Sequence, residues 1–324
     1  MLKLLVKIGF LFTAAVGIIW LLSRNDNTRP LAQESVQRLQ VAPEYTDLDY
    51  LFVGPSFTYA GLDPKQFTEL GHSAFNLGTM DAGPWYCDLI VNDYIQTSGS
   101  PPKEILLCLS PLMFSNFADV WWRYPFHRYL NEPISQEEVI WEYRPLRTVH
   151  RMYRESAQKG ALNLVWSGDP QREIDSLRQQ LRDRLGYTYN DNGSDIDPRN
   201  TMADSNRLKP QLAIAKTYSQ YLFVPRKTPD YFSMIERWQQ QGIKVTIVEI
   251  PTCQTLPYYS KHFREQYAQV KELIAEKNIP FVAKQDFEHN PLYFGDIGHL
   301  NRYGGREYTR YVIEKLGLNT GNRE

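Results

Sequence analysis

Two stretches at opposite ends of the chain hold residue types that could form a serine nucleophile with its acid–base partners. Asp296 and His299 lie three residues apart in Phe294-Gly295-Asp296-Ile297-Gly298-His299-Leu300-Asn301, and Ser56 ends the distant run Leu51-Phe52-Val53-Gly54-Pro55-Ser56. A three-residue spacing can place Asp296 and His299 on one side of a turn. Asp296 could then accept from one imidazole nitrogen while the other nitrogen faces Ser56. Such a triad would attack an ester and form an acyl-enzyme.

Each of these residues also has a purely structural interpretation. A serine is common in a strand-to-helix turn, and Asp296 could cap the last helix, with His299 an ordinary residue of its first turn. Either end of the chain alone is therefore weak evidence. The catalytic hypothesis depends on the fold bringing Ser56 and His299 together.

Short apolar runs alternate with helical patterns on both sides of a long interruption. Strands are expected at 48–53, 73–78, 104–109, 243–250 and 279–282, and helices at 84–97, 229–241, 261–277 and 302–316, with a turn and a short helix over 56–70. This alternation predicts an α/β fold, a three-layer α/β/α domain with a mainly parallel sheet. Ligands of such sheets bind at the carboxyl ends of the strands, and Ser56 comes directly after the first of them.

The interruption covers about 112–226 and predicts a large, mostly helical insertion, with helices at 136–157 and 170–185. The insertion contains Trp121 and Trp122, which could stack on sugar rings in a substrate groove or pack the insertion against the sheet. We expect the α/β domain to span 45–318 with this insertion inside it, and a tail at 319–324.

The N-terminus predicts a membrane anchor. Residues 4–22 are apolar or small except for Lys7 and Thr13, and Lys7 can reach the interface from near the end of a span. A cleaved signal peptide is the main alternative, but no A-x-A-like site comes after residue 22. The expected order is an uncleaved single-pass anchor at 1–24 and a linker at 25–44, with the bulk of the chain extracytoplasmic.

Composition excludes several other classes of protein. The hydrophobic fraction of 42% and the charged fraction of 23% are those of a globular chain, and a net charge of −1 provides no general attraction for nucleic acid. The three cysteines and six histidines show no metal-ligand spacing. No phosphate-binding glycine loop is present, so neither a metal nor a cofactor is expected.

The serine turn and the Asp-x-x-His stretch resemble the SGNH hydrolase superfamily, also called the GDSL family. That resemblance implies Ser56 as nucleophile, His299 as base and Asp296 as its partner, with the backbone N–H groups of Ser56 and Gly78 as oxyanion donors. Gly78 is assigned this role because the run Phe75-Asn76-Leu77-Gly78 resembles the family motif whose Gly N–H helps to bind the oxyanion. Two positions depart from the family pattern. Pro55 replaces the family's usual Asp before the Ser, and Ser110-Pro111 stands where the family has an Asn after the next strand.

The sequence looks closest to membrane-anchored members such as alginate O-acetyltransferase-like proteins and the D-alanyl-lipoteichoic acid biosynthesis protein. That likeness rests on the N-terminal anchor, the Phe-Asn-Leu-Gly run and His-Leu-Asn-x-x-Gly at 299–304. It implies an O-acyltransferase or esterase acting on a cell-envelope or exported polysaccharide, with a polytopic membrane protein as acyl donor. Asn116 and the two tryptophans would be substrate contacts. The alternative is a catalytically inactive envelope protein that keeps the fold for binding or assembly.

Overall fold

The computed structural model describes residues 30–119, 130, 219–253, 258–295 and 298–318. Its centre is a five-stranded sheet in the order β2-β1-β3-β4-β5, and all four pairings are parallel. The strands are β1 (Tyr50–Val53), β2 (Ala74–Asn76), β3 (Glu104–Leu109), β4 (Lys244–Glu249) and β5 (Phe281–Val282). The expected α/β class with a parallel sheet is confirmed.

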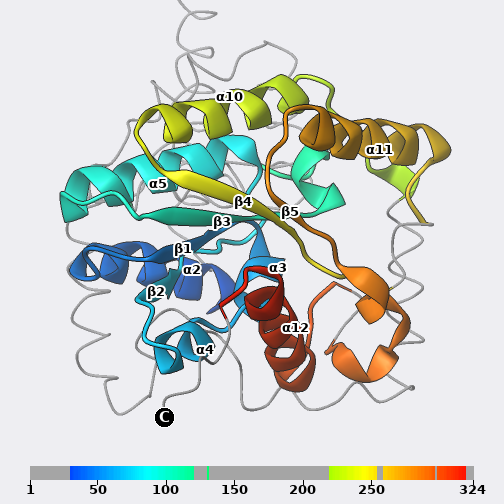
Figure 1. The fold of residues 1–324 in the computed structure, drawn as a ribbon. Coiled ribbons are helices and arrows are strands. Elements are labelled where there is room, and N and C mark those ends of the chain that lie inside the picture. Colours follow the sequence, from blue (N-terminus) through cyan, green and yellow to red (C-terminus); the bar gives the residue numbers. More distant parts are fainter. Residues whose placement is uncertain (1–29, 120–129, 131–218, 254–257, 296–297, 319–324) are drawn as a thin grey trace, which may run out of the picture.

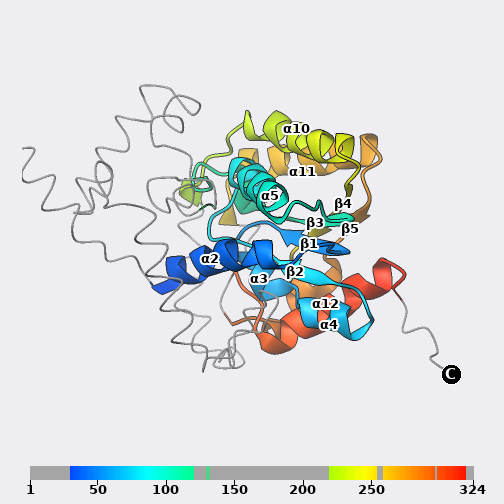
Figure 2. The ribbon, with the colours of Figure 1, turned by 90° about the vertical axis from the view of Figure 1, so that its left-hand side faces the viewer.

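Helices cover both faces of this sheet (Figures 1 and 2). Helices α5 (Pro84–Ser98), α10 (Lys227–Gln240) and α11 (Lys261–Glu276) lie on one face, and α3 (Ser56–Gly61), α4 (Pro64–Glu69) and α12 (Arg302–Lys315) lie on the other. Successive strand residues alternate between the two core clusters: Leu51 and Val53 pack toward α5, whereas Phe52 packs toward α12. Burial on both faces explains why these strands are continuous apolar runs in the sequence.

Most element boundaries agree with those expected from the sequence. The range 56–70 contains two helices, α3 and α4, separated by Leu62 and Asp63. Helix α5 ends before Gly99 and helix α10 before Gly242, both at positive φ, as is common at helix C-termini. The helices expected at 136–157 and 170–185 lie outside the described residues.

The segment expected to be a linker forms structure instead. Residues Pro30–Val41 are helix α2, which leads into the 3-10 turn η1 (Ala42–Glu44). Val36 and Leu39 of α2 are 4% and 2% exposed and belong to the core cluster on the α5 face. From residue 35 onward this stretch is therefore packed onto the domain. No helix among the described residues has the length and apolarity to cross a membrane, and residues 1–29 lie outside that set.

The two ends of the expected insertion meet beside the carboxyl end of β3. After the 3-10 turn η2 (Pro111–Phe114), Ser115 forms an antiparallel bridge with Phe223. The N–H of Val224 donates to the carbonyl of Phe114 at 2.8 Å. Insertion and domain are thus joined by paired backbone segments, and the chain leaves and re-enters the domain at the same place.

Candidate active site

Ser56 is the first residue of α3, directly beyond the carboxyl end of β1. In this strand order the chain turns to opposite sides after β1 and β3, and the gap between them is where open parallel sheets bind ligands. The turn requires Gly54, whose φ is +151°. A Cβ there would lie 2.5 Å from Thr58 Oγ1 and 2.9 Å from Cys108 Cβ. Ser56 is 5% exposed.

His299 lies in the loop that precedes α12. The segments entering and leaving this loop are held by an isolated bridge between Phe294 and Leu300, and Gly295 N–H donates to the His299 carbonyl at 3.0 Å. Two residues beyond His299, Asn301 is 1% exposed and is the N-cap of α12. Its Oδ1 accepts from Gly304 N–H at 2.8 Å, while its Nδ2 donates to the Leu292 carbonyl at 2.7 Å and to the Phe294 carbonyl at 3.3 Å.

The packing of α12 against α3 brings the two ends of the chain together. Gly305 allows the close approach, because a Cβ at this position would lie 2.7 Å from the Ala60 carbonyl oxygen. Thr309 Oγ1 adds hydrogen bonds, accepting from Asp63 N–H at 2.9 Å and donating to the Gly305 carbonyl at 2.7 Å. As a result His299 Nε2 lies 2.8 Å from Ser56 Oγ.

This distance is that of a hydrogen bond between a nucleophile and its general base. With the ring proton on Nδ1, Nε2 accepts the hydroxyl proton of Ser56. The imidazole ring is also packed against aromatic side chains of α3, with the Phe57 ring centroid 5.0 Å from its own. The pair is therefore arranged for removal of the Ser56 proton.

The two expected oxyanion donors differ in whether their backbone N–H group already donates to an acceptor within the protein. The N–H of Ser56 belongs to the first turn of α3, where N–H groups have no acceptor within the helix. The N–H of Gly78, in contrast, donates to Asn76 Oδ1 at 3.0 Å. Asn76 is itself fixed, since its Nδ2 donates to the carbonyls of Thr58 and Leu62. An oxyanion would have to compete with Asn76 for the Gly78 N–H.

The remaining sequence-predicted residues divide into two groups. Asp296, Trp121 and Trp122 lie outside the described residues. No contact between Asn116 and Ser56 is seen among the described residues. Instead, Asn116 Oδ1 accepts from Leu222 N–H at 2.9 Å, and the Asn116 backbone N–H donates to the Leu222 carbonyl. Asn116 therefore helps to close the base of the insertion.

The sequence prediction gave no role to two residues that hold the site, Asn301 and Asn76. Asn301 caps α12, so the interpretation in which Asp296 is that cap is wrong. A signal for this role was present, because Asn is a preferred N-cap residue. Asn76, which ties the end of β2 to α3, is a buried amide in an apolar strand, and only the tertiary structure shows its partners.

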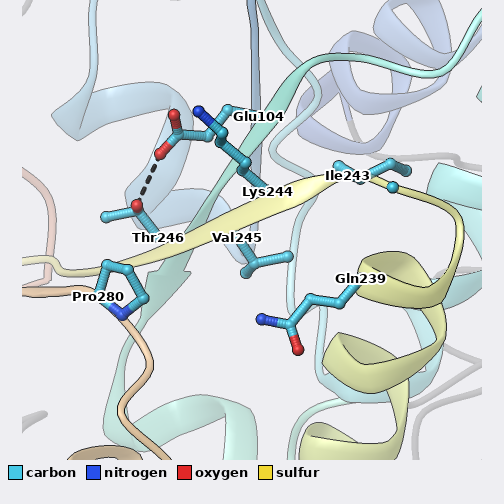
Figure 3. Close-up of a pocket in the computed structure, with 8 residues that line it drawn as sticks. Glu104, Gln239, Ile243, Lys244, Val245, Thr246 and Pro280 are labelled. Carbon is cyan, nitrogen blue, oxygen red and sulfur yellow. Dashed lines mark hydrogen bonds between the residues drawn. The ribbon is translucent and has the colours of Figure 1, made fainter.

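A hollow at the other end of the sheet carries no such chemistry (Figure 3). It lies at the amino ends of β3 and β4, whereas Ser56 lies at the carboxyl edge. Thr246 Oγ1 donates to Glu104 Oε1 at 2.6 Å across it. Its lining residues are Glu104, Gln239, Gly242, Ile243, Lys244, Val245, Thr246 and Pro280. None of these is a histidine, so no hydroxyl of this hollow has an imidazole as its base.

The buried thiols near the sheet are poor nucleophiles. Burial raises the pKa of Cys108 to about 12 and raises the pKa of Cys87 well above its ordinary value. A thiol with such a pKa is almost wholly protonated at neutral pH and does not compete with an activated hydroxyl. Ser56, in contrast, has an imidazole nitrogen in hydrogen-bonding contact with its hydroxyl.

Comparisons with known proteins provide little beyond this geometry. No protein-family model matches the sequence, and no curated protein matches it. Among solved structures, the chain is similar to a candidate acylhydrolase from Bacteroides fragilis, with 11% sequence identity and a TM-score of 0.39 over 91% of this chain and 98% of that chain. Similarity at this level assigns neither an activity nor a substrate.

Proposed function

We propose that this protein is a serine acyl-ester enzyme in which Ser56 is the nucleophile and His299 the general base. The observation that carries the proposal is the 2.8 Å contact between Ser56 Oγ and His299 Nε2, formed by residues from the two ends of the domain. The contact lies at the carboxyl edge of a parallel sheet, where such folds place their sites. The resemblance of the two motifs to SGNH hydrolases supports the same chemistry.

The proposed reaction has two halves. Ser56 Oγ attacks the carbonyl carbon of an ester while His299 Nε2 takes the hydroxyl proton. The tetrahedral intermediate then expels the alcohol, which receives that proton, and leaves acyl-Ser56. In the second half His299 deprotonates an acceptor hydroxyl, which attacks the acyl group and frees Ser56. Asp296 would orient the imidazole and stabilise the imidazolium.

The identity of the acceptor decides the class of enzyme. Water as acceptor makes the protein an esterase, and a sugar hydroxyl makes it an O-acyltransferase. We propose a cell-envelope or exported polysaccharide as the acylated substrate, with residues 1–24 as a membrane anchor and the domain extracytoplasmic. A polytopic membrane protein would then supply the acyl group. The apolar N-terminal stretch and the resemblance to envelope-modifying enzymes motivate this assignment.

A fluorophosphonate probe tests the nucleophile, because it reacts covalently with an activated serine hydroxyl. We expect stoichiometric labelling of the full-length protein in detergent, and loss of labelling in Ser56→Ala and His299→Ala. Ser260→Ala is the matched control, since Ser260 also lies at the start of a helix but caps α11 through Phe263 N–H. Labelling that persists in folded Ser56→Ala would contradict the proposal. Acetyl transfer from p-nitrophenyl acetate to added oligosaccharides, measured against release to water, separates transferase from esterase.

The second candidate function is a catalytically inactive envelope binding or assembly protein. The hydrogen bond that occupies the Gly78 N–H favours it, because loss of one oxyanion donor typically lowers the rate by about 10²–10³-fold. Folded wild-type protein that neither reacts with the probe nor hydrolyses activated esters would support this function instead.

A further inference from the structure

The imidazole of His299 is held by the helix that also carries Ser56. The Phe57 ring lies 5.0 Å from the His299 ring, centroid to centroid, and the Tyr59 ring lies 6.4 Å from it at an interplanar angle of 19°. Phe57 is 8% exposed, so its ring is fixed by the core. Because α3 supplies the nucleophile and both rings, a rigid α3 sets the position of the imidazole relative to Ser56.

Tyr59 is in turn packed against a buried cation from another element. The Cζ atom of Arg38 lies 4.2 Å from the centroid of the Tyr59 ring, and Arg38 is 2% exposed. The Arg38 guanidinium also approaches the Gly78 carbonyl, with Nη1 at 3.5 Å. The guanidinium therefore connects α2 to α3 and to the loop after β2.

Helix α2 is itself packed onto the domain, so the backbone that carries Arg38 is held in place. Val36 and Leu39, on either side of Arg38 in sequence, are buried in the core cluster of the α5 face. Burying a guanidinium costs free energy that an apolar side chain of similar size would not. A planar, charged group over an aromatic face is, however, well suited to hold a ring in one orientation.

We infer that Tyr59, held by Arg38, is a positioning residue for His299 in the reaction proposed above. Neither side chain exchanges a proton with the substrate. Their role is to limit rotation of the imidazole so that Nε2 stays directed at Ser56 Oγ. Misplacement of a catalytic group by about 1 Å can lower a rate by about 10²-fold, so a modest loosening of this stack should be measurable.

The test compares Tyr59→Leu, Tyr59→Phe and Arg38→Met in the full-length protein, using p-nitrophenyl acetate hydrolysis and the rate of fluorophosphonate labelling. We expect Tyr59→Leu to lower kcat and the labelling rate by about 10–100-fold with KM within about two-fold, because the ring positions the base and does not bind the ester. Tyr59→Phe keeps the ring and should restore the wild-type rate. Arg38→Met should lower kcat by a smaller factor, also at unchanged KM.

Tyr45→Leu is the matched control, because Tyr45 is also half-buried but packs against Phe75, away from His299. It should lower the urea midpoint while leaving kcat within about two-fold of wild type. Unchanged kcat in folded Tyr59→Leu, or a Tyr59→Phe protein as slow as Tyr59→Leu, would overturn the inference. If Tyr59→Leu does not fold, Arg38→Met decides, and an unchanged kcat there has the same meaning.

This inference rests on the proposed function but can fail independently of it. Persistence of labelling in Ser56→Ala would reject the nucleophile. Loss of labelling in Ser56→Ala together with a wild-type kcat in Tyr59→Leu would keep the nucleophile and reject only the positioning role.

Discussion

Replacement of Asn301 by Ala should be among the most costly single changes near the site. The side chain is 1% exposed and makes three hydrogen bonds, one to the Gly304 N–H and two to carbonyls of the loop that precedes it. Loss of the N-cap bond costs about 1 kcal/mol. The Phe294 carbonyl, left buried without its donor, costs about 1–2 kcal/mol, and the Leu292 carbonyl somewhat less because water can reach this exposed residue. The sum is about 3 kcal/mol.

The assay is urea unfolding of the full-length protein monitored by circular dichroism, with fluorophosphonate labelling measured below the transition. With an m-value of about 1–3 kcal/mol/M, we expect the Asn301→Ala midpoint to fall by about 1 M or more. Labelling of the folded variant should also slow, because the loop that carries His299 loses its attachment to α12. Asn301→Asp keeps the cap acceptor but places an oxygen against the two carbonyls, so it should be nearly as unstable as Asn301→Ala.

Ser260→Ala separates the cap from the loop attachment. Ser260 caps α11 through Phe263 N–H at 3.2 Å and makes no comparable bond to a loop within the part of the chain that the structure describes, so its loss should cost only about 1 kcal/mol. An Asn301→Ala protein no less stable than Ser260→Ala would refute the reasoning. A fully stable Asn301→Asp would show that capping alone accounts for the role of Asn301.

Three further changes test the packing and electrostatics of the domain. Gly305→Ala should lower the free energy of unfolding by about 1–3 kcal/mol in urea titrations, because the clash with the Ala60 carbonyl at 2.7 Å outweighs the gain of up to about 1 kcal/mol that Ala brings to a helix. The hydrogen bond from Lys103 is the largest cause of the lowered pKa of the Asp49 carboxyl. The stability that the ionised Asp49 contributes is therefore present above the unfolded pKa of about 3.9 and is lost as the pH falls through the lower folded pKa. Asp49→Asn should therefore lose less stability than wild type on acidification, measured by unfolding at a series of pH values. Lys227→Met should cost about 3–5 kcal/mol in the same assay, because Lys227 Nζ lies 3.2 Å from the Asp119 carboxylate and both side chains are below 10% exposed.

Specific results would contradict each of these expectations. A stabilised Gly305→Ala protein would mean that α12 shifts without cost. An identical acid dependence of wild type and Asp49→Asn would remove the linkage argument. For Lys227, the double variant Lys227→Met/Asp119→Asn should be more stable than Lys227→Met alone, since the unpaired buried charge is then gone. Equal stability of the two would show that the ion pair is not the cause.

The sequence missed helix α2 for a physical reason. Gln37, Arg38 and Gln40 are polar, yet they are buried beside Val36 and Leu39. Because polar side chains share the buried face of this helix, apolar periodicity alone indicates its burial only weakly. Their burial depends on partners such as the Tyr59 ring, which are distant in sequence.

The oxyanion donors show the same limit of prediction from sequence for a single hydrogen bond. The expected second strand, 73–78, ended at Gly78, whereas β2 ends at Asn76 and Gly78 lies beyond it, beside α3. Asn76 Oδ1 accepts a hydrogen bond from Gly78 N–H because of how the turn folds, and residue types alone do not predict this bond. The role of Gly78 therefore stays a prediction.

The chain's local patterns determined its strands, most of its helices and the two motifs that would have to meet. Apolar runs ended by Gly54 and Pro111 indicate buried parallel strands, and such strands bring the residues beyond their carboxyl ends to one edge of the sheet. Whether Ser56 and His299 meet was decided only by tertiary structure. The 2.8 Å contact depends on Gly305, which lets α12 approach α3, and on Asn301, which fixes the loop that carries His299. These are contacts between segments distant in sequence, and no local propensity specifies them.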